Sequence, residues 1–383
     1  MVNAFEFATS GRILFGPGRA RELPALAREF GTRALVITGS NPQRFQPLVD
    51  SLRDQQISWN TFSIRGEPTV ANAAEGAELA RSAECEMIIA IGGGSVIDAA
   101  KAVAALATNR RDVLDYLEVI GKAQPLTESP LPVVAVPTTA GTGAEVTRNA
   151  VLQSPEHRVK VSLRSPRMLP RIALVDPDLA LDLPPAITAS TGMDALTQLI
   201  EPFVSRRANP ITDALCRDGI PRVARSLARA YRDGADRDAR NEMALASLFG
   251  GLALANAALG AVHGFAGPIG GMFPAPHGAV CAALLGNVME ANIAAATEQN
   301  AAELVSRYRE VAQMLTGNAD PSAGVAWIRA LCQELKIPRL ARFGIQRGDL
   351  STIAAKAAAS SSMKGNPVTF SEPQLAAVLE RAL

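Results

Sequence analysis

Short, continuously apolar runs alternate with segments of helical periodicity over the first half of the chain. Residues 87–91 (MIIAI) and 132–136 (PVVAV) show no polar alternation, which is typical of strands that are covered on both faces of a sheet. Strands that alternate with helices predict parallel βαβ units and a doubly wound, Rossmann-like sheet. The predicted strands are residues 33–38, 59–64, 87–91, 132–136 and 171–176, and the predicted helices are residues 45–54, 69–82 and 95–108.

The pattern changes after Pro184 and Pro185, because the later segments have helical periodicity. We therefore predict an α/β domain over residues 1–182 and an all-α domain over residues 183–383. Residues 4–8 are predicted to form a further strand, either at an edge of the sheet or across a dimer interface. The later helices are predicted at residues 185–203, 211–232 and 237–259, with several more up to residue 383.

One stretch, residues 243–289, contains no Asp, Glu, Lys or Arg and is long enough to cross a membrane. It nevertheless holds His263, His277, Asn256 and Asn287 together with three prolines. Polar groups in lipid need internal partners, so this composition favours buried helices joined by a loop.

Composition narrows the class of protein. The 38 basic side chains nearly balance the 37 acidic ones, which argues against a nucleic-acid binder. The apolar fraction of 48% and the length indicate a globular protein with two domains. The four cysteines have no CxxC spacing and the first residues lack a signal-peptide pattern. We therefore expect a cytoplasmic protein with reduced thiols.

Two glycine-containing loops each follow a predicted buried strand. The strand at residues 87–91 runs into Gly92, Gly93, Gly94 and Ser95, which open a helix. Glycines allow the backbone to come close to a ligand, and the start of a helix offers free N–H groups and a positive dipole end to a pyrophosphate. A strand-to-helix turn that binds no ligand would have the same sequence pattern. The second loop, PTTAGTGAE at residues 137–145, should reach the same carboxyl edge of the sheet, where ligands bind in open α/β folds.

These two loops, GGGSVIDAAK at residues 92–101 and PTTAGTGAE at residues 137–145, resemble those of the iron-containing (group III) alcohol dehydrogenase family. The order of segments matches over essentially the whole chain, including FGPG at residues 15–18, VDP at 175–177 and KGNP at 364–367. The resemblance implies the fold shared with dehydroquinate synthase: a dinucleotide-binding domain, a helical metal-binding domain and a cleft between them for hydride transfer.

The resemblance also implies cofactor contacts. Gly39, Ser40 and Asn41 follow the second strand, where an acidic residue would repel the 2′-phosphate of NADP. No acidic residue stands there and Arg44 is near, so we favour NADP over NAD as the cofactor. Arg44 is also consistent with a solvated residue at a helix start, so NAD stays an alternative. The other implied contacts are Gly92, Gly93, Gly94 and Ser95 for the pyrophosphate, Thr138, Thr139 and Thr142 for the adenine and ribose side, and Asp98, Asn149 and Lys160 near the bound cofactor.

Candidate metal ligands lie in the helical half. Asp194 and Gln198 have i, i+4 spacing, and His263 and His277 are each followed by glycine. Histidines in an apolar stretch are usually core residues, but the family places one Asp and three His around a divalent metal. Asp194, His263 and His277 match three of these positions and are the implied catalytic residues, while Gln198 falls at the fourth. An amide oxygen is a weaker ligand for Fe²⁺ or Zn²⁺, so Gln198 or a water completes the set, or the metal is lost.

A second departure is Gly267, which stands where the family often has another histidine. Without it, proton transfer falls to water, the cofactor ribose or Thr142. The bound metal would polarise the substrate oxygen; without a metal, the two histidines would act as electrophile and acid. The predicted pocket wall is mostly apolar, and comprises Phe249, Leu254, Phe265, Met272 and Phe273 with small neighbours.

The predicted function is therefore NAD(P)-dependent interconversion of a small alcohol and its aldehyde or ketone. Three alternatives stay open. Arg148 and Lys160 could bind the carboxylate of an oxo-acid, as in the maleylacetate reductase branch, with or without a metal. A lyase or cyclase that holds NAD tightly would need more cationic side chains near the histidines than the sequence offers. A non-catalytic NAD(P)-binding descendant would explain Gln198 and Gly267. The resemblance also implies a homodimer.

Overall fold

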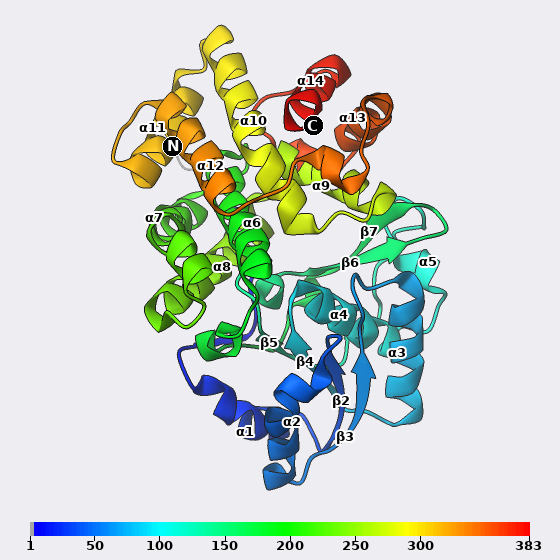
Figure 1. Cartoon of the computed structure of the whole chain (residues 1–383). Helices are drawn as coiled ribbons and strands as arrows, with labels where there is room; N and C mark the ends of the chain where they lie inside the picture. The colour runs from blue at the N-terminus through cyan, green and yellow to red at the C-terminus, as the bar shows by residue number, and fades with distance from the viewer. Residues whose placement is uncertain (1–3) are drawn as a thin grey trace. The chain divides into compact units, whose positions relative to one another are not determined.

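The structure is a computed structural model that describes residues 4–383, and the chain divides into two compact units. The α/β unit comprises residues 9–139 and 143–181. The helical unit comprises the described residues up to Ala8, residues 140–142 and residues 182–383. Figure 1 shows the strands of the first unit and the helices of the second.

The α/β unit is built on a six-stranded sheet with the order β1-β8-β5-β4-β2-β3, and all its pairs are parallel. The predicted parallel, Rossmann-like fold is therefore confirmed, and β1 adds an edge strand that the sequence pattern did not reveal. The strands are β1 Arg12–Phe15, β2 Arg33–Thr38, β3 Ser58–Ser63, β4 Met87–Gly92, β5 Val133–Pro137 and β8 Ile172–Val175.

Helices cover both faces of this sheet, which explains the apolar runs. On β4, Ile88 and Ala90 pack in one core cluster, and Met87, Ile89 and Ile91 pack in another. The first cluster includes residues of α4 (Gly94–Thr108) and the second includes residues of α1 (Leu23–Arg28). A strand between two apolar layers has no face that favours polar residues.

Helix α3 (Val70–Ser82) begins as predicted, with Thr69 and Asn72 forming a capping box. The predicted helix at residues 45–54 is instead three short pieces, and α2 (Gln46–Asp50) lies between two 3₁₀ turns. Pro42 and Pro47 each stand in the first turn of a piece, where a proline without an N–H is tolerated but cannot continue a preceding helix.

Two further differences concern strands. Residues 4–8 do not form the predicted strand. Instead, the backbone N–H and carbonyl of Ala8 bond to the side-chain amide of Asn256 at 2.7 and 3.0 Å, so a side chain replaces the partner strand. An antiparallel hairpin of β6 (Asn149–Ser154) and β7 (Val159–Arg164) was not predicted.

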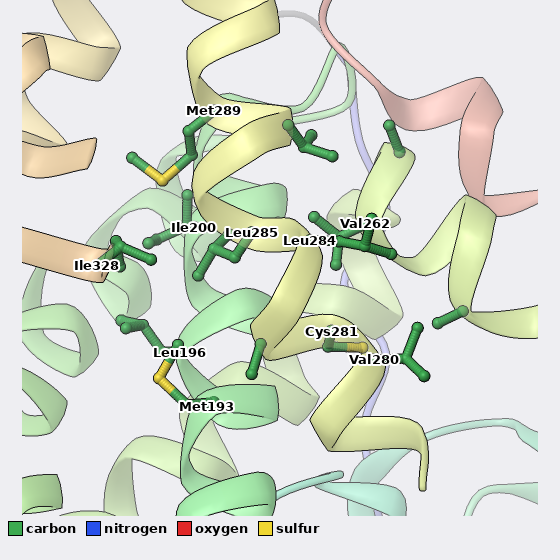
Figure 2. Packing of buried hydrophobic residues seen from close by; sticks show 14 of the residues in the cluster. Met193, Leu196, Ile200, Val262, Val280, Cys281, Leu284, Leu285, Met289 and Ile328 are labelled. Atoms are coloured by element: carbon green, nitrogen blue, oxygen red, sulfur yellow. The ribbon is translucent and has the colours of Figure 1, made fainter. Parts of the chain in front are cut away.

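Helices make up the helical unit, as predicted, and α10 (His277–Glu298) runs through its core. Figure 2 shows Leu285 and Met289 of α10 among Leu196 and Ile200 of α6 and Ile328 of α12. Helix α10 is long and apolar enough to cross a membrane, but 67% of its most apolar window is buried, so we assign it as a core helix. The helices are α6 Pro185–Val204, α7 Pro210–Arg232, α8 Arg237–Ala257, α9 Ala261–Met272, α10 His277–Glu298, α11 Ala302–Thr316, α12 Pro321–Glu334, α13 Leu350–Ala358 and α14 Glu372–Ala382.

Candidate functional site

The two glycine-containing loops begin side by side in the α/β unit, because β4 and β5 are paired and Gly92 stands opposite Pro137. The N–H of Thr138 donates to the carbonyl of Gly92 at 3.0 Å. A Cβ placed on Gly93 would lie only 3.2 Å from Oγ1 of Thr139. The loops that the sequence expects at one sheet edge are therefore brought together there.

Gly92 and Gly93 also define the start of α4. A Cβ on Gly92 would lie 2.5–2.9 Å from the side-chain atoms of Val96, so only glycine fits without a shift. Gly93 is the N-cap of α4, and no described side chain caps this end. The first N–H groups of the helix and its positive dipole end are thus suited to an anion, such as the pyrophosphate that the motif predicts.

Asp98 and Lys101 hold the second loop against α4. Nζ of the fully buried Lys101 lies 2.9 Å from Oδ1 of Asp98 and donates to Oγ1 of Thr147 and the carbonyl of Ala144. The other oxygen of Asp98 accepts the N–H of Val151 on β6 at 3.0 Å. Asp98 and Lys101 of the GGGSVIDAAK motif therefore have a structural role, because their ion pair anchors the second loop and β6 to α4.

The remaining predicted cofactor residues are more dispersed. Asn149 starts β6, and Lys160 on β7 pairs with Glu67 at 2.9 Å. Gly39, Ser40 and Asn41 follow β2, as expected, and Arg44 beyond them donates to the carbonyl of Leu179 at 3.0 Å. Their contacts with a cofactor stay predictions, and so does the contact of Thr142, which belongs to the helical unit.

Four potential metal ligands meet in the helical unit, from three helices. Asp194 lies on α6, His263 on α9, and His277 and Cys281 on α10, with donor atoms all within 4.8 Å of one another. Oδ1 of Asp194 is 3.3 Å from Nε2 of His263 and 3.7 Å from Nε2 of His277. Three of the four residues are those proposed from the sequence, separated by up to 83 positions in the chain.

The glycines that follow the two histidines allow this approach. A Cβ on Gly278 would lie 2.2 Å from the carbonyl oxygen of Ser190 on α6, and a Cβ on Gly264 would lie 2.8 Å from Cε of Met363. The close approach of α10 to α6 therefore depends on the absence of a side chain next to His277.

Glu201 orients His263. Its Oε2 is 2.7 Å from Nδ1 of His263, and its Oε1 accepts the N–H of Val262 at 2.7 Å. A carboxylate only accepts, so Nδ1 of His263 carries the proton and Nε2 is left to face Asp194. Sequence reasoning missed this role, although Glu201 stands seven residues after Asp194 and therefore lies on the same face of α6.

Asn366 of the KGNP motif also positions His263, because it bonds to the start of α9. Oδ1 of Asn366 accepts the N–H of Ala261 at 3.1 Å, and its Nδ2 donates to Oδ1 of Asn292 at 2.9 Å. Asn292 lies on α10, so Asn366 joins the start of α9 to α10. The two helices that carry the histidines are therefore held together by a buried amide pair.

Charges within the cluster shift the pKa values of its members. Burial raises the pKa of the Asp194 carboxyl, but His277 and His263 outweigh burial and the net shift is downward. Burial lowers the pKa of His263, but Cys281, Asp194 and Glu201 outweigh it and hold the pKa well above its ordinary value. The cluster thus favours an ionised Asp194, which suits a metal ligand, and a protonated His263, whose Nε2 proton a metal ion would have to displace.

Gln198 is placed differently from the other predicted ligands. Its Nε2 donates to Oδ2 of Asp194 at 3.0 Å, and its Oε1 has no hydrogen-bond partner among the described residues. A Cβ on Gly250 would lie 3.7 Å from that Oε1. Whether Gln198 binds a metal stays a prediction.

The predicted pocket wall fits only in part. Phe265 is fully buried in the core, which makes it a packing residue, whereas Phe249, Met272 and Phe273 are partly buried against that core. A Cβ on Gly267 meets no described atom within 4 Å. Whether a substrate uses this space stays a prediction.

Comparison with known proteins covers nearly the whole chain. The iron-containing alcohol dehydrogenase family matches residues 10–177, and the C-terminal family of Fe-containing alcohol dehydrogenases matches residues 188–383. Alcohol dehydrogenase 4 of Saccharomyces cerevisiae is 37% identical over 82% of this chain and 80% of its own length. A 1,3-propanediol dehydrogenase of Klebsiella pneumoniae is 36% identical over 92% of both chains.

Two further similarities extend over the full length. An NAD-dependent methanol dehydrogenase of Bacillus methanolicus is 30% identical over 97% of both chains. The crystal structure of a 1,3-propanediol oxidoreductase has a TM-score of 0.93, with 32% identity over all of both chains. This chain therefore belongs to the iron-containing alcohol dehydrogenase family.

Proposed function

We propose that this chain transfers hydride between a small alcohol, or its aldehyde or ketone, and NADP or NAD, at a site that holds one divalent metal ion. Membership of the family makes the chain an oxidoreductase of the alcohol dehydrogenase class. The observation that carries the site is Oδ1 of Asp194, a buried oxygen without a hydrogen-bond partner among the described residues. It lies 3.3 and 3.7 Å from two imidazole Nε2 atoms. A buried anionic oxygen is costly unless a positive charge joins it, and that charge is either a protonated imidazole or a bound metal ion that takes the place of its proton.

Asp194, His263 and His277 are the ligands that we assign to this ion, Fe²⁺ or Zn²⁺. One carboxylate and two imidazoles form a donor set that suits either metal. When bound, the ion supplies positive charge that polarises the oxygen of the substrate. Glu201 keeps Nε2 of His263 available to it by accepting the proton on Nδ1.

The start of α4, from Gly92 to Ser95, is proposed to bind the pyrophosphate of the cofactor through backbone N–H groups. Thr138 and Thr139 stand beside these glycines, which supports their assignment to the cofactor. Asp98 and Lys160 are both held in ion pairs, so we expect them to shape the site near the cofactor. Asn149, Thr142 and the Gly39-Ser40-Asn41 turn complete the proposed contacts.

The substrate is expected to be small. The relatives are named for methanol and 1,3-propanediol, and the open space at Gly267 offers room for a short chain. Proton transfer to or from the substrate oxygen is assigned to Thr142, water or the cofactor ribose, because Gly267 has no side chain. We also expect a homodimer in the cytoplasm.

The oxo-acid alternative has less support. It relies on Arg148 and Lys160 to bind a carboxylate, and Glu67 lies 2.9 Å from the Lys160 ammonium group and neutralises that one of the two. A second anion would have to compete with this carboxylate. The non-catalytic alternative relies on the absence of a bound metal, so it is tested by the metal content and turnover measurements described next.

The test is metal content and turnover after anaerobic purification and incubation with Fe²⁺ or Zn²⁺. We expect about one ion per chain, and turnover of short alcohols with NADP or NAD. Asp194→Ala should lose both the ion and the turnover. A wild-type protein that retains no metal, yet binds cofactor without turnover on alcohols, aldehydes or oxo-acids, would overturn the proposal.

A further inference from the structure

Cys281 lies within the donor cluster although its role is not explained by the resemblance. It is buried on α10, four residues after His277, so the two side chains share one face of the helix. Its Sγ is 3.8 Å from Nε2 of His277 and 3.9 Å from Nε2 of His263. We propose that Cys281 is a ligand of the metal in this chain and completes the set formed by Asp194, His263 and His277. The inference rests on the proposed function, because it deepens the assignment of the same site.

The spacing of the donor atoms supports a four-residue set. Metal–N distances of about 2.0 Å and metal–S distances of about 2.3 Å give a tetrahedron an N···S edge of about 3.6 Å. The two N···S separations around Cys281 exceed this value by only a few tenths of an ångström. The separations of Asp194 from the two histidines, 3.3 and 3.7 Å, fall in the same range. The other two separations, between the two imidazoles and between Asp194 and Cys281, are within 4.8 Å, so the helices must move closer for all four donors to reach one ion.

A second observation points to a cation at this place. Oδ1 of Asp194 is buried and has no hydrogen-bond partner among the described residues, yet it faces the imidazoles. This oxygen and Sγ of Cys281 belong to one group whose donor atoms lie within 4.8 Å of one another. A lone buried thiol would need no such neighbours, since free cysteine packs as a small apolar side chain.

Gln198 does not supply the fourth donor in this arrangement. Its amide NH₂ faces Oδ2 of Asp194, and a carboxylate that only accepts requires the nitrogen there. The amide oxygen therefore points away from that carboxylate, and it lies near Gly250 of α8. We assign Gln198 the role of orienting Asp194, so that Oδ1 faces the histidines.

A thiolate would change the properties of the site. Sulfur is a soft ligand that favours Zn²⁺ over harder ions such as Mn²⁺. Binding converts the thiol to a thiolate and releases its proton to the solvent, so the site would then carry two negative ligands. These neutralise the charge of a divalent ion, whereas a set with one carboxylate and neutral ligands leaves one positive charge.

Cobalt substitution tests the inference, because thiolate ligands give Co²⁺ a near-ultraviolet charge-transfer absorption that oxygen and nitrogen ligands lack. We expect this absorption in the Co²⁺-loaded wild-type protein and its loss in Cys281→Ser at saturating Co²⁺. Affinity for Zn²⁺ should fall by more than about 100-fold in Cys281→Ser, since even outer-shell changes cost 10–100-fold. Cys332→Ser is the matched control, because Cys332 donates to the carbonyl of Ala282 on the same helix and lies outside the cluster. It should keep both the absorption and the affinity.

The outcomes separate the two proposals. Stoichiometric Co²⁺ binding without the sulfur absorption, or Cys281→Ser with wild-type Zn²⁺ affinity, would overturn the role of Cys281 and leave the metal site intact. Loss of metal in Gln198→Leu together with full retention in Cys281→Ser would assign the fourth position to Gln198. A wild-type protein that binds neither Co²⁺ nor Zn²⁺ would overturn the proposed metal site itself. Circular dichroism of each variant identifies any loss that comes from unfolding.

Discussion

Two candidate sites of this molecule are built in different ways. The first, here called the cradle, is the start of α4 at residues 92–95 together with the neighbouring Thr138 and Thr139. The second, the donor cluster, consists of Asp194, His263, His277 and Cys281. The cradle consists of backbone groups at two adjacent strand ends, and its motifs are continuous in the sequence. The cluster consists of side chains from three helices, and its members are far apart in the chain. The cradle depends on the absence of side chains at its glycines, whereas the donor cluster depends on the presence of a few specific side chains.

Among the buried carboxylates, Asp194 of the helical unit and Glu145 of the α/β unit behave differently. Two imidazoles lower the pKa of Asp194 despite its burial. Burial raises the pKa of Glu145 from 4.5 to about 7, and the charge of Lys101 does not compensate. Asp194 is therefore prepared to stay ionised, while Glu145 in the PTTAGTGAE loop is neutral at mildly acidic pH.

The largest effect is expected from removing one donor of the cluster. His263→Ala should lower kcat/KM by on the order of 10³-fold or more, because the metal charge at the substrate oxygen is lost with it. His157→Ala is the matched control, since His157 bonds to Ser154 in the β6–β7 hairpin and lies outside the cluster. It should stay within about twofold of the wild type. Steady-state kinetics with a short alcohol measure both, and equal losses would contradict the assignment.

Glu145→Gln is expected to change the pH dependence of stability. The native carboxyl has the higher pKa, so the native state binds more protons than the unfolded state between pH 4.5 and about 7. The free energy of unfolding therefore falls as the pH rises through this window, and a shift from 4.5 to about 7 corresponds to roughly 3 kcal/mol.

The neutral amide of Glu145→Gln removes this cost. The variant should be more stable than the wild type at pH 8 and similar to it at pH 5, as measured by urea unfolding at each pH. A variant that is less stable at pH 8 would show that the ionised Glu145 is stabilised in the fold.

Glu201→Gln should weaken the cluster without removing a ligand. The amide can no longer accept from both Nδ1 of His263 and the N–H of Val262, so the imidazole loses its fixed tautomer. We expect the dissociation constant for Zn²⁺ to rise by about 10–100-fold, with no change in that for the cofactor. Titrations of both ligands measure this, with exposed Glu303→Gln as the control. An equal loss of cofactor affinity would indicate general unfolding.

The smallest effect is expected from adding a methyl group to the cradle. Gly92→Ala places its Cβ 2.5–2.9 Å from atoms of Val96 and should lower the free energy of unfolding by roughly 1–2 kcal/mol. Gly93→Ala meets only Thr139, at 3.2 Å or more, and should cost less. Its main effect should be weaker cofactor binding, because the methyl group occupies the helix start.

A second substitution sharpens this result. Val96→Ala in the Gly92→Ala background removes the atoms that the new Cβ meets, so part of the lost stability should return. Urea unfolding of the single and double variants gives the coupling, and strictly additive losses would place the cost of Gly92→Ala elsewhere.

The sequence by itself determined the parallel sheet, the order along the chain of β2, β3, β4, β5 and β8, and the glycine–threonine loops, because these depend on periodicity and on contiguous residues. It also indicated Asp194, His263 and His277, although only through a resemblance. Tertiary structure decided the positions of β1 and the β6–β7 hairpin, and it replaced the predicted strand at residues 4–8 with contacts to Asn256.

Tertiary structure also decided the composition of the donor cluster. The i, i+4 spacing of His277 and Cys281 is a visible signal, as is the spacing of Asp194 and Glu201, but similar pairs occur on many helices. Only the packing of α6, α9 and α10 brings Cys281 within 4 Å of both histidines and Glu201 against Nδ1 of His263. Local patterns determine which face of a helix a residue shares, but only the packing of helices distant in the chain determines which faces meet.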